Sequence, residues 1–250
     1  MRSEPLSWPS GTDGPLRAVL FDVDGTLYRL APVRRRMGAR LLAECLKNPP
    51  RGYAAVRLLS AYRKAQELLR GAAGLRPDIA SAHLAAACAA TGLSAEAAAP
   101  VIHQWMERAP LGMIGAWLRE GTVELLRSLR QAGTRLGAVS DYPAEAKLAS
   151  LGIRHWFDVV ICAQDPEVQR FKPDPRGIEV ALRRLGVVPR QALYVGDRPE
   201  VDGMAARRAG VRCAIVAGRD PITRAVPLRS EISQKTRQFP AADAHRTTGD

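Results

Sequence analysis

The chain has 250 residues, of which 46% are apolar and 25% charged, and its formal net charge at pH 7 is +12. This composition is typical of a soluble globular protein, and no apolar run approaches the roughly 20 residues of a membrane-spanning helix. The positive charge is concentrated between residues 31 and 119, which hold 13 Lys and Arg against 5 Asp and Glu. That segment has few aromatic residues and no recognised nucleic-acid motif, so a basic face for a small anionic substrate explains the charge at least as well.

The two ends of the sequence differ from the rest in composition. Residues 1–15 are rich in proline and glycine and have no apolar signal segment, and in residues 225–250 the apolar periodicity fades. We expect both segments to be flexible. The four cysteines are far apart, without a C-x-x-C pair, which indicates reduced thiols in a cytoplasmic protein.

The first predicted element is a buried strand over residues 16–21, a short apolar run preceded by turn residues. The sequence Asp22-Val-Asp24-Gly-Thr26 follows at once. Two carboxylates at the end of a buried strand are costly unless a cation or a reaction uses them. Gly25 allows a sharp turn that leaves backbone N–H groups free to face an anion.

Residues 31–115 are rich in Ala, Leu and Arg with helical periodicity, and they contain no strand signal. They predict an all-helical insertion directly after the first strand. Its helices are expected near residues 33–47, 52–70, 77–91 and 94–108.

From residue 120 onward, helices and short apolar strands alternate. The predicted helices cover residues 122–131, 144–150, 175–185 and 201–209, and the predicted strands cover 135–140, 157–163, 192–196 and 211–217. This alternation predicts an α/β fold, a doubly wound, Rossmann-like parallel sheet. We expect residues 16–30 and 116–222 to form this core and residues 31–115 to form the helical domain inserted into it.

Functional groups in such a sheet gather beyond the carboxyl ends of the strands. Here those positions hold an acid pair, a hydroxyl, a lysine fixed between prolines and a second acid pair. The residues are Asp22 and Asp24, Ser140 and Asp141, Lys172, and Asp197 with Asp202.

Together these side chains suit phosphate transfer. One carboxylate can act as a nucleophile through an acyl-phosphate intermediate, and a divalent cation must then offset the repulsion between carboxylate and phosphate. Mg²⁺ prefers such all-oxygen sites. Lysine and hydroxyl balance the phosphoryl charge, and a second acid can move the protons.

The combination resembles the haloacid dehalogenase-like (HAD) superfamily, whose four motifs occur here in order. They are Asp22-Val-Asp24-Gly-Thr26, Ser140, Lys172, and Gly196-Asp197 with Asp202. The resemblance implies an α-helical (C1-type) cap and an enzyme similar to phosphoglycolate phosphatase, with Asp22 as nucleophile and Asp24 as general acid and base. It also implies that Ser140 and Lys172 hold the phosphate with Thr26 and Asp141 beside them, Thr26 steadying the loop. Mg²⁺ would be ligated by Asp22, Asp197 and the backbone carbonyl of Asp24, with Asp202 assisting.

Two residues depart from the family pattern: Asp141 replaces a common Asn, and Arg198 replaces a small hydroxyl residue. Both bear on site charge and substrate more than on activity. A Mg²⁺-dependent phosphatase of a small phosphorylated metabolite is the leading hypothesis. The alternatives are a 2-haloacid dehalogenase, which needs neither the second acid nor Mg²⁺, a phosphomutase, and a non-catalytic basic binding protein. We expect no nucleic-acid or membrane partner.

Substrate choice is expected to lie in the helical cap. Four arginines cluster at its start, Arg34, Arg35, Arg36 and Arg40. The hypothesis is that one or more of them face the cleft and bind a second anionic group such as a carboxylate. The competing interpretation is a solvated basic face. Arg57, Arg63 and Arg70 are further candidates.

Overall fold

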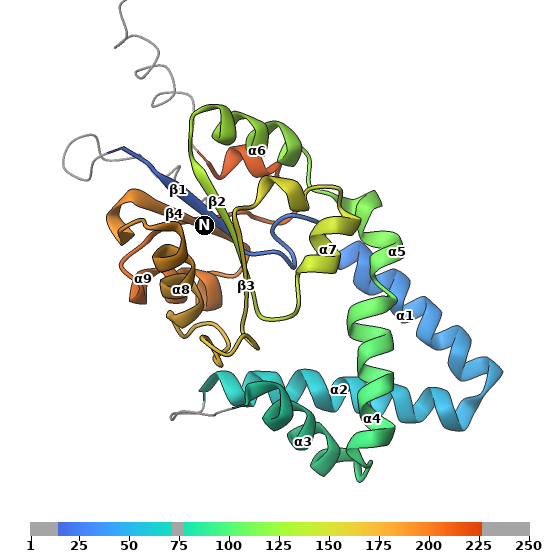
Figure 1. Cartoon of the computed structure of the whole chain (residues 1–250). Helices are drawn as coiled ribbons and strands as arrows, with labels where there is room; N and C mark the ends of the chain where they lie inside the picture. The colour runs from blue at the N-terminus through green and yellow to red at the C-terminus, as the bar shows by residue number, and fades with distance from the viewer. Residues whose placement is uncertain (1–14, 72–77, 227–250) are drawn as a thin grey trace, which may run out of the picture.

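The computed structural model describes residues 15–71 and 78–226, which form an α/β core and a group of helices beside it (Figure 1). The segments predicted to be flexible, 1–15 and 225–250, lie almost wholly outside the described residues.

The core contains five parallel strands in the order β3-β2-β1-β4-β5. The strands are β1 (Ala18–Phe21), β2 (Arg135–Ser140), β3 (Val159–Cys162), β4 (Ala192–Gly196) and β5 (Arg212–Ile215). β1 lies in the middle and is fully buried. The chain adds strands first on one side of β1 and then on the other, so the order reverses between β1 and β4. Such a switch point is where ligands bind in open α/β sheets. The predicted doubly wound parallel sheet is confirmed.

Helices cover both faces of this sheet (Figure 1). The helices α6 (Thr122–Gln131) and α7 (Glu145–Ser150) lie on one face, and α8 (Arg176–Leu185) and α9 (Met204–Arg208) lie on the other. Side chains alternate along β1, so Val19 and Phe21 join the first hydrophobic cluster and Leu20 joins the second. Burial on both faces explains why β1 reads as a continuous apolar run.

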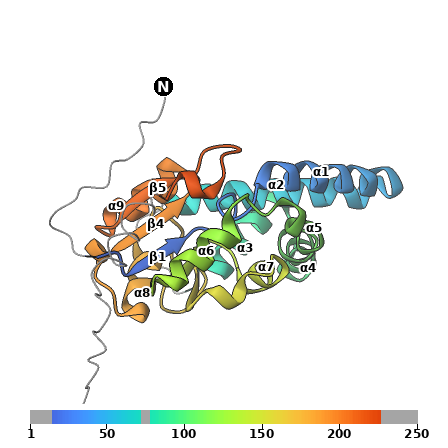
Figure 2. The same ribbon diagram turned by 90° about the horizontal axis from the view of Figure 1, so that it is seen from above.

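The insertion after β1 is helical, as predicted. It comprises α1 (Leu30–Lys47), α2 (Pro49–Gly71), α3 (Ile79–Thr91) and α4 (Ala95–Ile102), and the chain returns through a π-helical turn (His103–Arg108), α5 (Leu111–Ile114) and a 3₁₀ turn (Gly115–Trp117). Figure 2 shows α1 and α2 extending away from the sheet. A small core of Leu58, Tyr62, Ala87, Ala98 and Ile102 joins α2, α3 and α4. We call α1 to α4 the cap.

Several element bounds differ from the prediction for local reasons. The helix expected from residue 77 begins at Ile79, because the Asp78 side chain accepts the Ser81 N–H as an N-cap. The helix expected over 94–108 changes to a π-helical turn at His103, soon after Pro100. The helix expected over 201–209 likewise opens with a π-helical turn, Pro199–Gly203.

Within the described part of the chain, no single helix is long and apolar enough to cross a membrane. One bent pair, Ile79–Thr91 with Ala95–Trp117, passes the length and composition test together at an angle of 111°. His83, Ala87, Ala98 and Ile102 of this pair are buried within the protein.

Candidate active site

The loop after β1 places a buried carboxylate at the switch point of the sheet. Asp22 is 5% exposed, its N–H donates to the Val195 carbonyl of β4 (2.8 Å), and Thr26 Oγ1 donates to its Oδ2 (2.9 Å). Gly25 follows with φ of 108°, and a Cβ at this position would lie 2.1 Å from Asp197 Oδ2. The glycine therefore lets the β1 and β4 loops approach closely.

Three carboxylates from these two loops converge. Each of Asp22, Asp197 and Asp202 offers an oxygen, and these oxygens all lie within 4.8 Å of one another. Asp202 is 1% exposed, and its Oδ2 accepts the N–H groups of Asp197 (3.2 Å) and Arg198 (3.0 Å). An all-oxygen set of this kind is the donor chemistry that Mg²⁺ prefers, so the residues present fit the metal.

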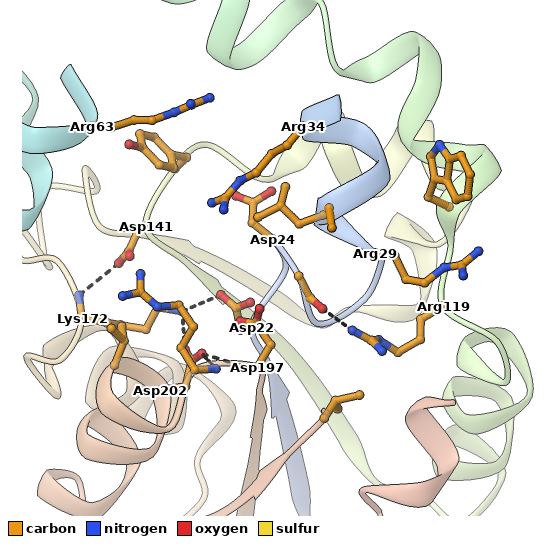
Figure 3. A pocket seen from close by; sticks show the side chains of 18 of the residues that line it. Asp22, Asp24, Arg29, Arg34, Arg63, Arg119, Asp141, Lys172, Asp197 and Asp202 are labelled. Atoms are coloured by element: carbon orange, nitrogen blue, oxygen red, sulfur yellow. Dashed lines mark hydrogen bonds and ion pairs between the residues drawn. The ribbon is translucent and has the colours of Figure 1, made fainter. Parts of the chain in front are cut away.

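Lys172 supplies the positive charge beside this cluster. Its Nζ donates to Asp22 Oδ1 (2.5 Å) and Asp202 Oδ1 (2.7 Å), and it is buried (Figure 3). Burial raises the pKa of Asp22 to about 8, because the charges of Asp202 and Asp197 add to it and only Lys172 opposes it. Burial and Asp202 also raise the pKa of Asp197 to about 6. One lysine does not offset the two buried carboxylates and the half-buried Asp197, so the cluster favours a further cation.

Asp141, one of the two residues that depart from the family pattern, forms a contact between core and cap. Its Oδ1 accepts the Lys172 N–H (3.0 Å), and its Oδ2 pairs with Arg70 Nη2 of α2 (2.7 Å). Arg70 Nη1 also donates to the Lys172 carbonyl (2.5 Å). Tyr142 OH donates to Gln66 Oε1 (2.8 Å) alongside. The extra negative charge of Asp141 is thus matched by an arginine from the cap.

Asp24 is held by two residues that the sequence analysis did not single out. Lys147 Nζ of α7 donates to Asp24 Oδ2 (2.5 Å), and the Tyr28 hydroxyl donates to Asp24 Oδ1. Both partners are buried. Burial by itself raises the pKa of Asp24, but the Lys147 charge and the two hydrogen bonds outweigh it and lower the pKa.

A third residue missed from sequence, Arg119, fixes the loop after β1 from behind. It is 4% exposed and donates to the carbonyls of Thr26 (2.9 Å), Gly25 (2.5 Å), Gly218 (3.1 Å) and Asp220 (2.8 Å). It thereby joins the loop that carries Asp22 and Asp24 to the loop after β5.

These groups open into one cavity of about 1040 Å³ between core and cap. Six of the eight predicted core-site residues line it, namely Asp22, Asp24, Asp141, Lys172, Asp197 and Asp202. Thr26 and Ser140 do not line it and are buried behind the loops, where Ser140 Oγ accepts the Tyr142 N–H (3.3 Å).

The arginine cluster divides into two groups. Arg34 and Arg35 line the cavity, whereas Arg36 and Arg40 do not. The Arg36 guanidinium instead lies 5.3 Å from the Trp117 ring centroid. Of the four arginines among which one or more were expected to face the cleft, two therefore line the cavity.

Comparison with known proteins identifies the family of the chain. The family model of haloacid dehalogenase-like hydrolases matches residues 16–210, which include all the acids of the site. The chain belongs to this family. It is 34% identical over 202 residues to the glyceraldehyde 3-phosphate phosphatase of Methanopyrus kandleri, covering 78% of this chain and 82% of that protein. It is 33% identical over 200 residues to the phosphoglycolate phosphatase of Pseudomonas putida, covering 79% and 68%. The predicted family is confirmed.

Solved structures share the architecture. A 2-haloacid dehalogenase from Pseudomonas syringae pv. tomato matches with a TM-score of 0.56 at 24% identity, covering 80% of this chain and 86% of that one. CbbY from Rhodobacter sphaeroides in complex with phosphate matches with a TM-score of 0.54 at 25% identity, covering 81% and 87%. Because HAD-like hydrolases of different activity share this fold, the reaction has to be argued from the side chains of the site.

Proposed function

We propose that the protein is a Mg²⁺-dependent phosphatase of a small phosphorylated metabolite, acting through an aspartyl-phosphate intermediate. The membership of the HAD-like hydrolases and the phosphatase relatives make it a hydrolase of phosphate esters. The single observation that carries the mechanism is that the two acids after β1 have different partners. Asp22 faces Lys172 and two further carboxylates, whereas Asp24 is bound by Lys147.

In the first step, an Asp22 carboxylate oxygen attacks the phosphorus and the ester oxygen leaves. Phosphorus thereby exchanges its bond to the alcohol oxygen for a bond to Asp22. This covalent intermediate divides the hydrolysis into two easier transfers. Lys172, already 2.5 Å from Asp22 Oδ1, is placed to neutralise the phosphoryl oxygens as charge develops on them. Asp24 gives the leaving oxygen its proton.

In the second step, Asp24 removes a proton from water, which attacks the phosphorus and releases phosphate from Asp22. Lys147 and Tyr28 favour the ionised Asp24, which is the form this step needs. For the first step Asp24 must carry a proton, and the negative charge of a bound phosphoryl group acts in that direction by raising its pKa. Because Asp24 gives its proton to the leaving oxygen in the first step, it is ionised when the second step needs a base.

Asp22, Asp197 and Asp202, with the Asp24 carbonyl, would hold Mg²⁺. When bound, the ion supplies positive charge that lets carboxylate and phosphate approach each other. The same acids argue against a 2-haloacid dehalogenase, which has no use for Asp24 or for the Asp197 and Asp202 pair.

We also propose a cytoplasmic location. The four cysteines, Cys45, Cys88, Cys162 and Cys213, are all free rather than joined in disulfides. Free thiols persist where the compartment is reducing.

The test is hydrolysis of a panel of phosphorylated metabolites by the purified protein, with Mg²⁺ and with EDTA. The expected result is phosphate release that needs Mg²⁺ and is abolished in Asp22→Asn. Glu124→Gln makes the same acid-to-amide change on the exposed surface of α6 and serves as the matched control. Turnover that persists in EDTA, or in Asp22→Asn, would overturn the proposal.

A further inference from the structure

The cavity has an excess of positive charge that the phosphoryl site does not use. Nine Lys and Arg residues line it against six Asp and Glu. Four of these cations have hydrogen-bonded or charged partners: Lys172 contacts Asp22 and Asp202, Arg70 contacts Asp141, Arg198 contacts Glu67 and Glu200, and Arg119 contacts backbone carbonyls. Arg29 lies over the Trp117 ring. Among the described residues, the other four have no hydrogen bond or ion pair; they are Arg34, Arg35, Arg63 and Arg219.

Two cavity arginines from different cap helices stand out. Arg34 comes from α1 and Arg63 from α2, and both line the cavity. Figure 3 shows the Arg63 side chain extending from α2 toward α1, and the Arg34 side chain extending from α1 toward Asp24. Among residues 15–71 and 78–226, neither has a hydrogen bond, an ion pair or a ring contact. Partial burial lowers the pKa of Arg63, and the positive charge of Arg34 lowers it further. Two unpaired guanidinium groups that repel each other form a site for an anion.

The location of this arginine pair relative to Asp24 indicates which part of the substrate it meets. Figure 3 shows Arg34 above Asp24, on the side of the cavity away from Asp197 and Asp202. Burial and the charge of Asp24 raise the pKa of the Tyr28 hydroxyl, and Arg34 is near enough to oppose them. Because Asp24 protonates the leaving oxygen, the leaving alcohol extends from Asp22 toward Asp24 and onward to the arginine pair.

We propose that the substrate is a phosphate monoester whose leaving alcohol carries a second anionic group, bound between Arg34 and Arg63. This inference rests on the proposed phosphatase function. Guanidinium groups bind carboxylate and phosphate by paired N–H donors, so either anion fits the chemistry of the subsite. A neutral leaving group would leave both cations with water as their only partner.

The chain provides its own control for a general effect of charge. Arg40 on α1 and Arg57 on α2 are exposed arginines of the same two helices, and neither lines the cavity. The double variant Arg34→Ala/Arg63→Ala can therefore be compared with Arg40→Ala/Arg57→Ala, which has the same change of net charge. Neither pair includes a buried side chain, so both variants are expected to fold.

Three substrates with one two-carbon skeleton test the inference. They are 2-phosphoglycolate with a carboxylate, ethylene glycol bisphosphate with a second phosphate, and 2-hydroxyethyl phosphate, which is neutral at that end. The wild type is expected to prefer at least one of the two anionic substrates. In Arg34→Ala/Arg63→Ala, kcat/KM for that substrate should fall roughly ten- to hundredfold, chiefly through KM, as the loss of a charged hydrogen-bonded contact predicts. The neutral substrate and the control variant should change less than about twofold.

The outcomes separate this inference from the proposed function. Hydrolysis of all three esters with a preference for the neutral one, or an equal loss for charged and neutral esters in the double variant, would overturn the anionic subsite and leave the phosphatase intact. Failure of the wild type to hydrolyse any phosphate monoester with Mg²⁺ would overturn the proposed function itself.

Discussion

The contact between Lys147 and Asp24 allows a prediction that sequence motifs do not. Lys147→Met keeps the unbranched apolar part of the side chain and removes the charged group that lies 2.5 Å from Asp24 Oδ2. Lys147 is 5% exposed, so water cannot replace the lost contact fully. Asp24 retains the hydrogen bond from Tyr28 and loses the other, which frees its carboxylate to rotate.

The expected losses of stability and of kcat in Lys147→Met follow from the burial of the ion pair and from its position beside the reacting atoms. Breaking a buried ion pair lowers the free energy of unfolding by about 3–5 kcal/mol. Because the Asp24 side chain is 20% exposed, we expect a loss at the lower end of that range. A general acid and base contributes about 10²–10⁴-fold, and a displacement of about 1 Å costs about 10²-fold, so kcat should fall about 10²-fold. KM should change little, because Lys147 does not line the cavity.

The assay is steady-state kinetics on the best substrate, with thermal unfolding in parallel. Lys147→Arg should recover part of kcat, because it retains the charge, and Lys47→Met on the exposed end of α1 is the control. Loss of Lys147 leaves burial to raise the pKa of Asp24, so the acidic limb of the rate profile should shift to higher pH. A Lys147→Met enzyme with wild-type kcat and stability would refute the reasoning.

Three further predictions concern the cap contact, a buried histidine and the metal. Arg70→Ala leaves the Asp141 carboxylate without its cation and should lower the free energy of unfolding by about 3 kcal/mol. A double-mutant cycle with Asp141→Asn, measured by urea unfolding, should show a coupling energy above about 1 kcal/mol. Burial lowers the pKa of His83, so as the pH falls this histidine is protonated in the unfolded chain before it is protonated in the folded one. Stability therefore falls as the pH drops below about 6.5. In His83→Phe the Tm should fall less steeply over the same pH range. Mg²⁺ should raise the Tm of the wild type, and Asp22→Asn should abolish this rise without lowering the Tm in EDTA.

The sequence predicted the fold well where a pattern has one physical cause. β1 is buried on both faces, so its residues are continuously apolar, and α8 is amphipathic because one side packs on the sheet. The π-helical turns at His103–Arg108 and Pro199–Gly203 were not predicted, since their residues fit an ordinary helix equally well.

The site was predictable to the extent that its residues follow strands. Asp22, Lys172 and Asp197 sit in loops whose place the strand order determines. Lys147, Tyr28 and Arg119 were missed because each of them reads as an ordinary surface or packing residue until the fold brings it to the β1 loop. A buried lysine on a short helix has no sequence signal of its own.

The measurement that tests the central claim most directly is identification of the phosphorylated residue. The protein is mixed with substrate and Mg²⁺, quenched in acid within the turnover time, and digested for mass spectrometry. The account predicts a phosphoryl group on the peptide that carries Asp22, and none in Asp22→Asn. Recovery of the phosphoryl group on another residue, or full turnover by Asp22→Asn, would contradict it.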